Sequence, residues 1–235
     1  HSFILNHLRT QRFCMVHVFT YQLAIFFTNT ITRPDQFLSK LNESSGNIFD
    51  SMPQIIPLPP EIPPEIPRVS STSASGIYSI NISLSRMDIT MNMVDSPLKE
   101  GDAISDFILK AKLIIKNIPS DVQLNRIGII GSYFELDKNP AITLSRKLAK
   151  KDLGNISEFN LRYNKPSSDF GYTFNNIYSI NNAQIDTRSI SSNGVFIQKD
   201  INNMPSETPM SKDLLIEILT KKIKELATSS IEGIL

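Results

Sequence analysis

The chain has 235 residues, of which 40% are hydrophobic and 20% are charged, and its formal net charge is +1. This composition indicates a globular protein and excludes a disordered chain, which would be less hydrophobic and more highly charged. The small net charge excludes a strong overall attraction to nucleic acid or to an acidic membrane, although a local basic patch is compatible with it.

The single cysteine, Cys14, cannot form a disulfide within the chain, so a reducing, cytoplasmic location is expected. All three histidines lie in the first 17 residues. The rest of the chain therefore lacks the usual Ser/His and Cys/His nucleophile pairs and most zinc ligands. The sequence predicts no cofactor and no metal site.

The first predicted element is an apolar run from Phe13 to Phe27, which follows Arg9 and Arg12. At about fifteen residues it is shorter than the ~20 that a spanning helix needs. Its Phe, Val, Tyr, Thr and Ile residues are typical of a buried strand, with an N-terminal signal or anchor as the alternative. No membrane span is expected. A helix is predicted to begin at Pro34.

Residues 53–67 contain seven of the fourteen prolines, which predicts an extended polyproline II arm. Such an arm has three residues per turn, so Pro57, Pro60, Pro63 and Ile66 share one apolar edge. We expect this edge to pack on the protein's own body. The alternative is a PxxP ligand for an aromatic groove on a partner. In both cases these four residues are candidate binding residues.

Residues 78–93 are predicted to form strands. Apolar residues occupy even positions up to Leu84 and odd positions from Met87, and a β-bulge near Ser85 would explain the change. Met87, Met91 and Met93 then share a strand face. Such a face is either an adaptable binding surface or ordinary core.

A helix over about 103–118 has the clearest apolar periodicity, and a strand over 122–134 follows it. Two glycines inside this strand, Gly128 and Gly131, are typical of a bulge or a close backbone approach. A second helix over about 140–150 carries four cations in six residues. They are a candidate nucleic-acid patch or an ordinary solvated face: Arg146, Lys147, Lys150 and Lys151.

From 156 to 201 the pattern predicts an antiparallel meander of four short strands, with turns near Asn181-Asn182 and at Asn193-Gly194. Ser211 is predicted to cap a final helix that ends near Ser229. The expected fold is thus α+β, a mostly antiparallel sheet backed by three amphipathic helices. Its parts are an N-terminal segment (1–52), the proline-rich arm and loop (53–75) and the main body (76–235), expected to form one domain.

Because no histidine or cysteine follows residue 17, an enzymatic site in the rest of the chain would have to be built from carboxylates, lysines and hydroxyls. The candidates are Asp88, Glu135, Asp137, Asp186 and Asp200. A metal-dependent nucleic-acid enzyme, using these acids with Lys199 and the basic helix, is the alternative function. The acids are otherwise expected to pair with arginines such as Arg86 and Arg126. We favour a non-enzymatic protein-binding or assembly protein whose partner is another protein or a second copy.

Three short motifs carry a resemblance that covers roughly residues 15–230: Ser83-x-x-Arg86-x-Asp88, Arg126-Ile127-Gly128 and Asp200-Ile201-Asn202. Their order resembles that of an uncharacterised, sporadically distributed bacterial family, which has no established catalytic residues. The layout is also similar to SecB-like export chaperones. The resemblance implies binding of extended polypeptides, assembly through sheet edges, and a role in a bacterial defence, toxin-antitoxin or phage system.

Overall fold

The computed structural model describes residues 15–94 and 96–235, and predictions about Phe13 and Cys14 fall outside these ranges. In the described residues ten strands form one antiparallel sheet with the order β2-β3-β4-β5-β1-β6-β10-β9-β7, and β8 pairs with β9. The strands are β1 (His17–Phe27), β2 (Gln54–Ile55), β3 (Val69–Thr72), β4 (Tyr78–Ile82), β5 (Arg86–Asn92), β6 (Leu124–Leu136), β7 (Asn160–Asn164), β8 (Ser167–Asp169), β9 (Tyr172–Asp186) and β10 (Ser191–Asn203).

The helices confirm the predicted α+β class. They are α1 (Pro34–Ser44), α2 (Glu100–Asn117), α3 (Pro140–Leu148), α4 (Lys212–Lys222), the 3-10 helix η1 (Ile223–Leu226) and α5 (Thr228–Glu232). The predicted final helix thus consists of three pieces, and Ser211 caps it as expected, because its hydroxyl accepts a hydrogen bond of 3.1 Å from the amide of Leu214.

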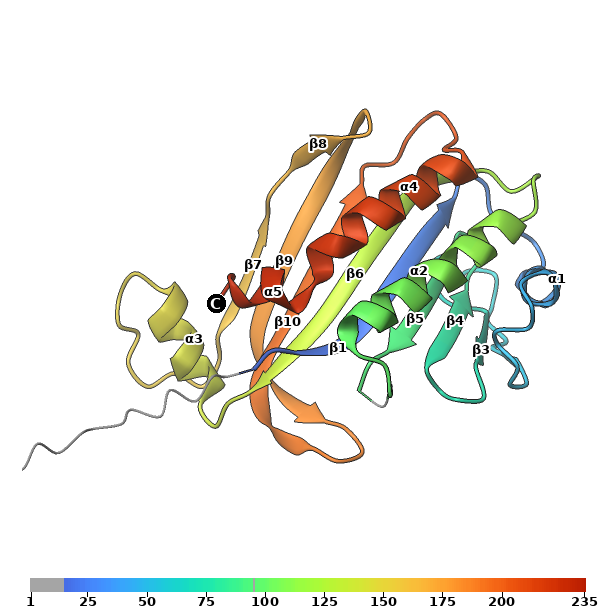
Figure 1. The fold of residues 1–235 in the computed structure, drawn as a ribbon. Helices are drawn as coiled ribbons and strands as arrows, with labels where there is room; N and C mark the ends of the chain where they lie inside the picture. The colour runs from blue at the N-terminus through green and yellow to red at the C-terminus, as the bar shows by residue number, and fades with distance from the viewer. Residues whose placement is uncertain (1–14, 95) are drawn as a thin grey trace, which may run out of the picture.

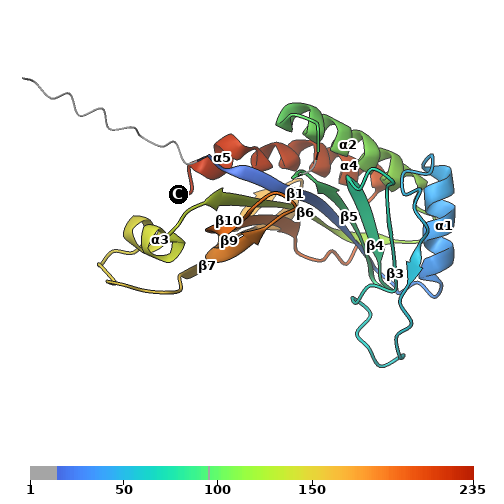
Figure 2. The same cartoon turned by 90° about the horizontal axis from the view of Figure 1, so that it is seen from below.

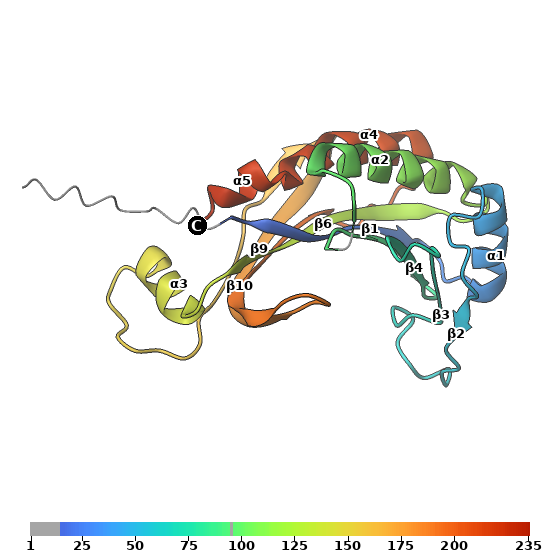
Figure 3. The ribbon, with the colours of Figure 1, turned by 60° about the horizontal axis from the view of Figure 1, so that its bottom comes forward.

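Helices α2 and α4 lie side by side on one face of the sheet, and the opposite face carries no helix over its central strands (Figures 1 and 3). The main core fills the space between these layers. β1 lies between β5 and β6, and its alternate side chains Tyr21, Leu23 and Ile25 are fully buried under the helices. The apolar run near the N-terminus is therefore the central strand, as its residue types predict. No helix of the described residues is long and apolar enough to cross a membrane.

Helix α3 lies at one end of the molecule, beyond α5, and packs against β9 and β10 (Figure 1). Leu144 of α3 belongs to a second, smaller core with Ile180, Val195 and Ile231. The predicted helix is confirmed, but it covers only the end of the sheet.

The predicted bulge near Ser85 is wrong, because the chain reverses there. β4 and β5 form a hairpin in which Ile82 pairs with Met87, and the amide of Ser83 donates to the carbonyl of Arg86 at 2.9 Å. The hairpin turn changes the parity of the apolar positions without any bulge. Met87 and Met91 are fully buried in the core, and Met93 packs against it. These three methionines are therefore core residues, which confirms the core alternative, and their interpretation as binding residues is wrong.

Two predicted turns in the meander are also wrong. Asn181 and Asn182 lie inside β9, and Asn193-Gly194 lies inside β10, so two long strands replace part of the predicted set. Pairing with β10 keeps β9 extended at Asn181 and Asn182. Gly194 has a packing role, because a Cβ atom there would lie 2.6 Å from the carbonyl oxygen of Glu135.

The short strand β8 is tied to α4 through Asp169, whose carboxylate lies 2.7 Å from the Lys221 ammonium and 3.1 Å from that of Lys222. Hydrogen bonds from Lys221 and Lys222 lower the pKa of Asp169 from 3.8 to about 2. A carboxyl with a lowered pKa stabilises the fold above its unfolded pKa, and this contribution disappears as the pH falls through the folded value.

We therefore expect the stability difference between the wild type and Asp169→Asn to be constant above about pH 4 and to shrink between about pH 4 and pH 2. Urea denaturation at several pH values measures this difference. A difference that grows as the pH falls would contradict the assignment.

The predicted polyproline II arm is wrong both in its conformation and in its packing on the protein's own body. Residues 56–68 form a loop between β2 and β3 with two turns, closed by amide-to-carbonyl bonds from Ile62 to Pro59 and from Ile66 to Pro63, both 3.2 Å. The turns break the three-residue repeat on which the predicted edge depended. The four residues of that edge are all exposed: Pro57, Pro60, Pro63 and Ile66.

Candidate functional site

The loop of residues 56–68, which we call the proline loop, projects from the sheet at the end opposite α3 (Figures 2 and 3). Its two arms are paired, since the amide of Ile56 donates to the carbonyl of Arg68 at 2.8 Å. A further bond of 3.0 Å runs from the amide of Leu84, in the β4–β5 turn, to the carbonyl of Pro64. These bonds hold the loop in one shape.

Arg68 is the central anchor of the proline loop. Its side chain is directed into the loop, the residue is only 9% exposed, and its guanidinium donates to the carbonyl of Ile62 at 2.9 Å. A second, longer contact of 3.5 Å reaches the carbonyl of Pro63. Proline-rich segments have few amide donors, so an arginine inside the loop supplies donors that the backbone lacks.

The proline loop and the strand before it display apolar side chains to solvent. The structure describes ten exposed large hydrophobic residues, and four of them lie between positions 52 and 66. Their exposed fractions are 88% for Met52, 67% for Ile55, 40% for Ile56 and 44% for Ile66. Scattered exposed hydrophobic residues need no explanation, but a cluster on a fixed loop is typical of a protein interaction site.

The proline loop also contains an apolar hollow of about 380 Å3, which lies between residues 55–60 and the residues Pro34, Arg68 and Leu84. Glu61 and Glu65 are exposed at the tip of the loop. The surface is therefore apolar with two carboxylates beside it. β2 is also the outermost strand of the sheet, but it has only two residues and is flanked by Pro53 and Pro57, which limits strand addition.

The basic residues Arg146, Lys147, Lys150 and Lys151 are in the last turn of α3 and just after it, at the other end of the molecule. All four of these side chains are exposed. The negative end of a helix dipole stabilises cations near the last turn of the helix, which is a sufficient structural reason for these residues.

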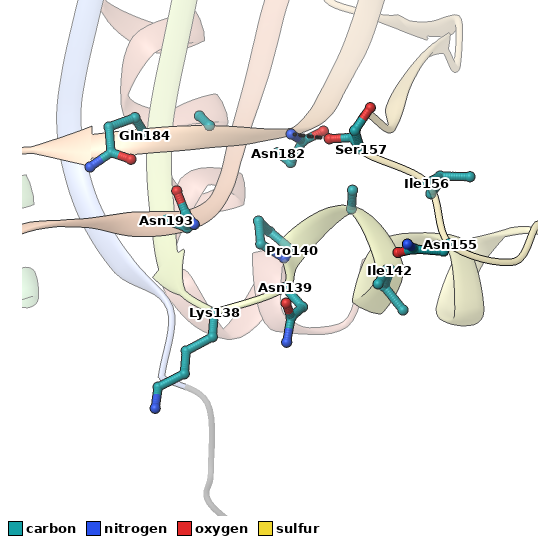
Figure 4. Close-up of a pocket in the computed structure, with 12 residues that line it drawn as sticks. Lys138, Asn139, Pro140, Ile142, Asn155, Ile156, Ser157, Asn182, Gln184 and Asn193 are labelled. Atoms are coloured by element: carbon teal, nitrogen blue, oxygen red, sulfur yellow. Dashed lines mark hydrogen bonds between the residues drawn. The ribbon is translucent and has the colours of Figure 1, made fainter.

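A second cavity of about 600 Å3 adjoins the first turn of α3 (Figure 4). Its lining is mostly amide and small apolar side chains from residues 138–142, 155–157, β9 and β10. The Asn182 side chain closes one side, because it donates to the carbonyl of Ser157 at 3.3 Å and accepts from the amide of Phe159 at 2.7 Å. Sequence patterns gave no indication of this cavity.

The candidate acids do not gather. Asp88 is on β5 and Asp200 is on β10, with β1 and β6 between them. Lys199 points to the helix-covered face, where its ammonium donates to the carbonyl of Glu225 at 3.1 Å. Asp186 lies at the end of β9 and bonds to the hydroxyl of Ser191. Among the described residues no three His, Cys, Asp or Glu side chains lie close enough to hold a metal ion.

The open face of the sheet contains a cluster that spacing along the chain could not predict. Phe26 lies directly opposite Arg86 on one side and Arg126 on the other, and their guanidinium carbons are 4.8 and 4.7 Å from its ring centre. Arg86 pairs with the carboxylate of Asp88, as expected of these acids, and Asp88 also accepts a bond of 2.8 Å from Gln22.

On the other side of the ring, Arg126 donates to the side-chain oxygen of Asn202 at 2.8 Å. Burial lowers the pKa of Arg126, although nearby Asp200 opposes this effect. The polar groups of this cluster thus bind mainly to one another across the strands. The cluster holds the register of the central sheet, which is a structural role.

The sequence matches no protein-family model and no curated protein. The resemblance to a sporadically distributed bacterial family and to SecB-like chaperones stays a prediction.

Proposed function

We propose that this chain is a non-enzymatic protein-binding or assembly protein that acts through the proline loop and β2. The observation that carries the proposal is the set of four exposed hydrophobic residues between positions 52 and 66, in and just before a loop that is fixed by backbone bonds and by Arg68. A fixed loop loses less conformational entropy on binding than a flexible loop does. More of the free energy gained by burying its apolar surface therefore appears as binding affinity.

The exposure of Pro57, Pro60 and Pro63 supports binding to a partner over packing on the protein's own body, but the turns of the loop exclude the extended PxxP conformation. A complementary partner would present an apolar or aromatic groove with basic residues at its rim, because Glu61 and Glu65 flank the loop. The separation of Asp88 from Asp200 supports a binding role over a metal-dependent enzyme.

The test compares full-length variants in pull-downs followed by mass spectrometry. Ile55→Ser/Ile56→Ser changes the proposed surface, and Leu109→Ser/Leu113→Ser changes two exposed leucines on α2 as a matched control. We expect the loop variant to lose bound protein at least about tenfold, as for interface residues at the centre of a contact, while the control keeps it. Equal recovery with both variants would contradict the proposal.

A further inference from the structure

We propose that the proline loop of one copy binds the α3 end of a second copy of this chain. This inference rests on the proposed function and names the partner. The acceptor surface, which we call the α3 end, comprises residues 137–158 together with the residues of β9 and β10 that line the cavity shown in Figure 4. The donor and acceptor surfaces lie at opposite ends of the molecule (Figures 1 and 3).

The two ends carry opposite charge. Residues 33–68 contain three cations and five carboxylates, a net charge of −2, whereas residues 137–158 contain five cations and three carboxylates, a net charge of +2. Two cations of the first segment are already engaged, since Arg33 pairs with Asp35 and Arg68 is directed into the loop. The chain is almost neutral as a whole, but its two ends carry opposite charge. This separation of charge favours a head-to-tail approach of two copies.

The apolar and polar groups are complementary as well. The α3 end has an exposed leucine, Leu153, and a cavity wall that includes Pro140, Ile142 and Ile156. Contact with such a surface would bury the exposed isoleucines and prolines of the proline loop. The volume of about 600 Å3 is within the range of pockets that enclose small ligands, so the cavity has room for side chains of the loop.

Hydrogen-bond chemistry favours the same contact. A proline-rich loop has backbone carbonyls but few amide protons, so it presents an excess of acceptors. The α3 end presents two kinds of donors. The first are the cations in the last turn of α3 and just after it, and the second are three side-chain amides on the cavity rim that bind no other described residue: Asn139, Asn155 and Asn193.

A contact between different surfaces of two identical chains is heterologous, and it extends into a ring or an open chain. A symmetric contact between two proline loops is disfavoured, because it would bring Glu61 and Glu65 of both copies together. Each copy would instead use its loop once and its α3 end once.

The test is a charge exchange measured by sedimentation equilibrium of the purified full chain. We expect the average mass of the wild type to rise above 26.4 kDa with concentration at about 0.1 M salt and to fall toward the monomer at about 1 M salt. Glu61→Lys/Glu65→Lys and Lys147→Glu/Lys150→Glu/Lys151→Glu should each weaken association about tenfold or more. An equimolar mixture of the two variants should restore it, because each altered end then meets an end of opposite charge.

The control variant, Lys112→Glu/Lys116→Glu on α2, should associate as the wild type does. A wild type that stays monomeric, or a variant mixture that fails to associate, would overturn the inference. A monomeric wild type whose Ile55→Ser/Ile56→Ser variant still loses bound protein would leave the proposed function standing with a different partner. If the wild type is monomeric and the Ile55→Ser/Ile56→Ser variant also keeps its bound protein, the proposed function is contradicted as well.

Discussion

Gly131→Ala should destabilise the fold by about 3 kcal/mol. Gly131 lies on β6 under the ring of Tyr133, and a Cβ atom at position 131 would lie 2.1 Å from the Tyr133 hydroxyl oxygen. Tyr133 is fully buried and donates to the carbonyl of Leu226 in η1, so the ring cannot move without breaking this bond. Overpacking costs about 1–3 kcal/mol, and an unpaired buried carbonyl costs a similar amount.

Gly128→Ala is the matched control on the same strand. A Cβ atom there would meet Ala24 at 3.5 Å and Asn202 at 3.8 Å, which are ordinary contacts. We expect a change of less than about 1 kcal/mol, as for substitutions without a clash. Urea denaturation of both variants measures the difference. Equal stabilities would show that the Tyr133 ring does not occupy the space above Gly131.

Arg68→Ala should release the proline loop. The substitution removes the bonds to the carbonyls of Ile62 and Pro63 and leaves a nearly buried site without its donor. A hydrogen bond to a charged group contributes about 1.5–3 kcal/mol, which corresponds to roughly a tenfold to hundredfold change in a local opening equilibrium. We expect the amides of Ile62 and Ile66 to exchange with solvent faster by about this factor.

Arg33→Ala is the control, because Arg33 is an exposed arginine whose ion pair with Asp35 is local to the start of α1. An exposed pair contributes about 0–1 kcal/mol, so exchange in the proline loop should not change. Hydrogen–deuterium exchange by mass spectrometry or NMR measures both variants. If Arg68→Ala leaves exchange in residues 62–66 unchanged, Arg68 is not the anchor of the loop.

Residue periodicity predicted the elements that form the core. The apolar run that became β1, the i, i+3, i+4 stripe of α2 and the cap at Ser211 all follow from local patterns. The asparagine turns failed because long-range pairing with β10 outweighs the local preference of Asn181 and Asn182 for turns.

The candidate site was predicted in part. The concentration of prolines indicated residues 53–67, but its exposed surface depends on contacts that are distant in sequence, such as the bond from Leu84 to Pro64. The stacking of Arg86 and Arg126 on Phe26 likewise requires the register of three strands. Such contacts are visible only once the sheet is assembled.

The most direct test of the central claim is site-specific photo-crosslinking within living cells. A benzophenone amino acid at position 56 lies on the proposed binding surface, and the same group at position 113 lies on the exposed face of α2. We expect discrete crosslinked products at position 56 and none at position 113. No product at position 56, or the same products at both positions, would contradict a binding role for the proline loop.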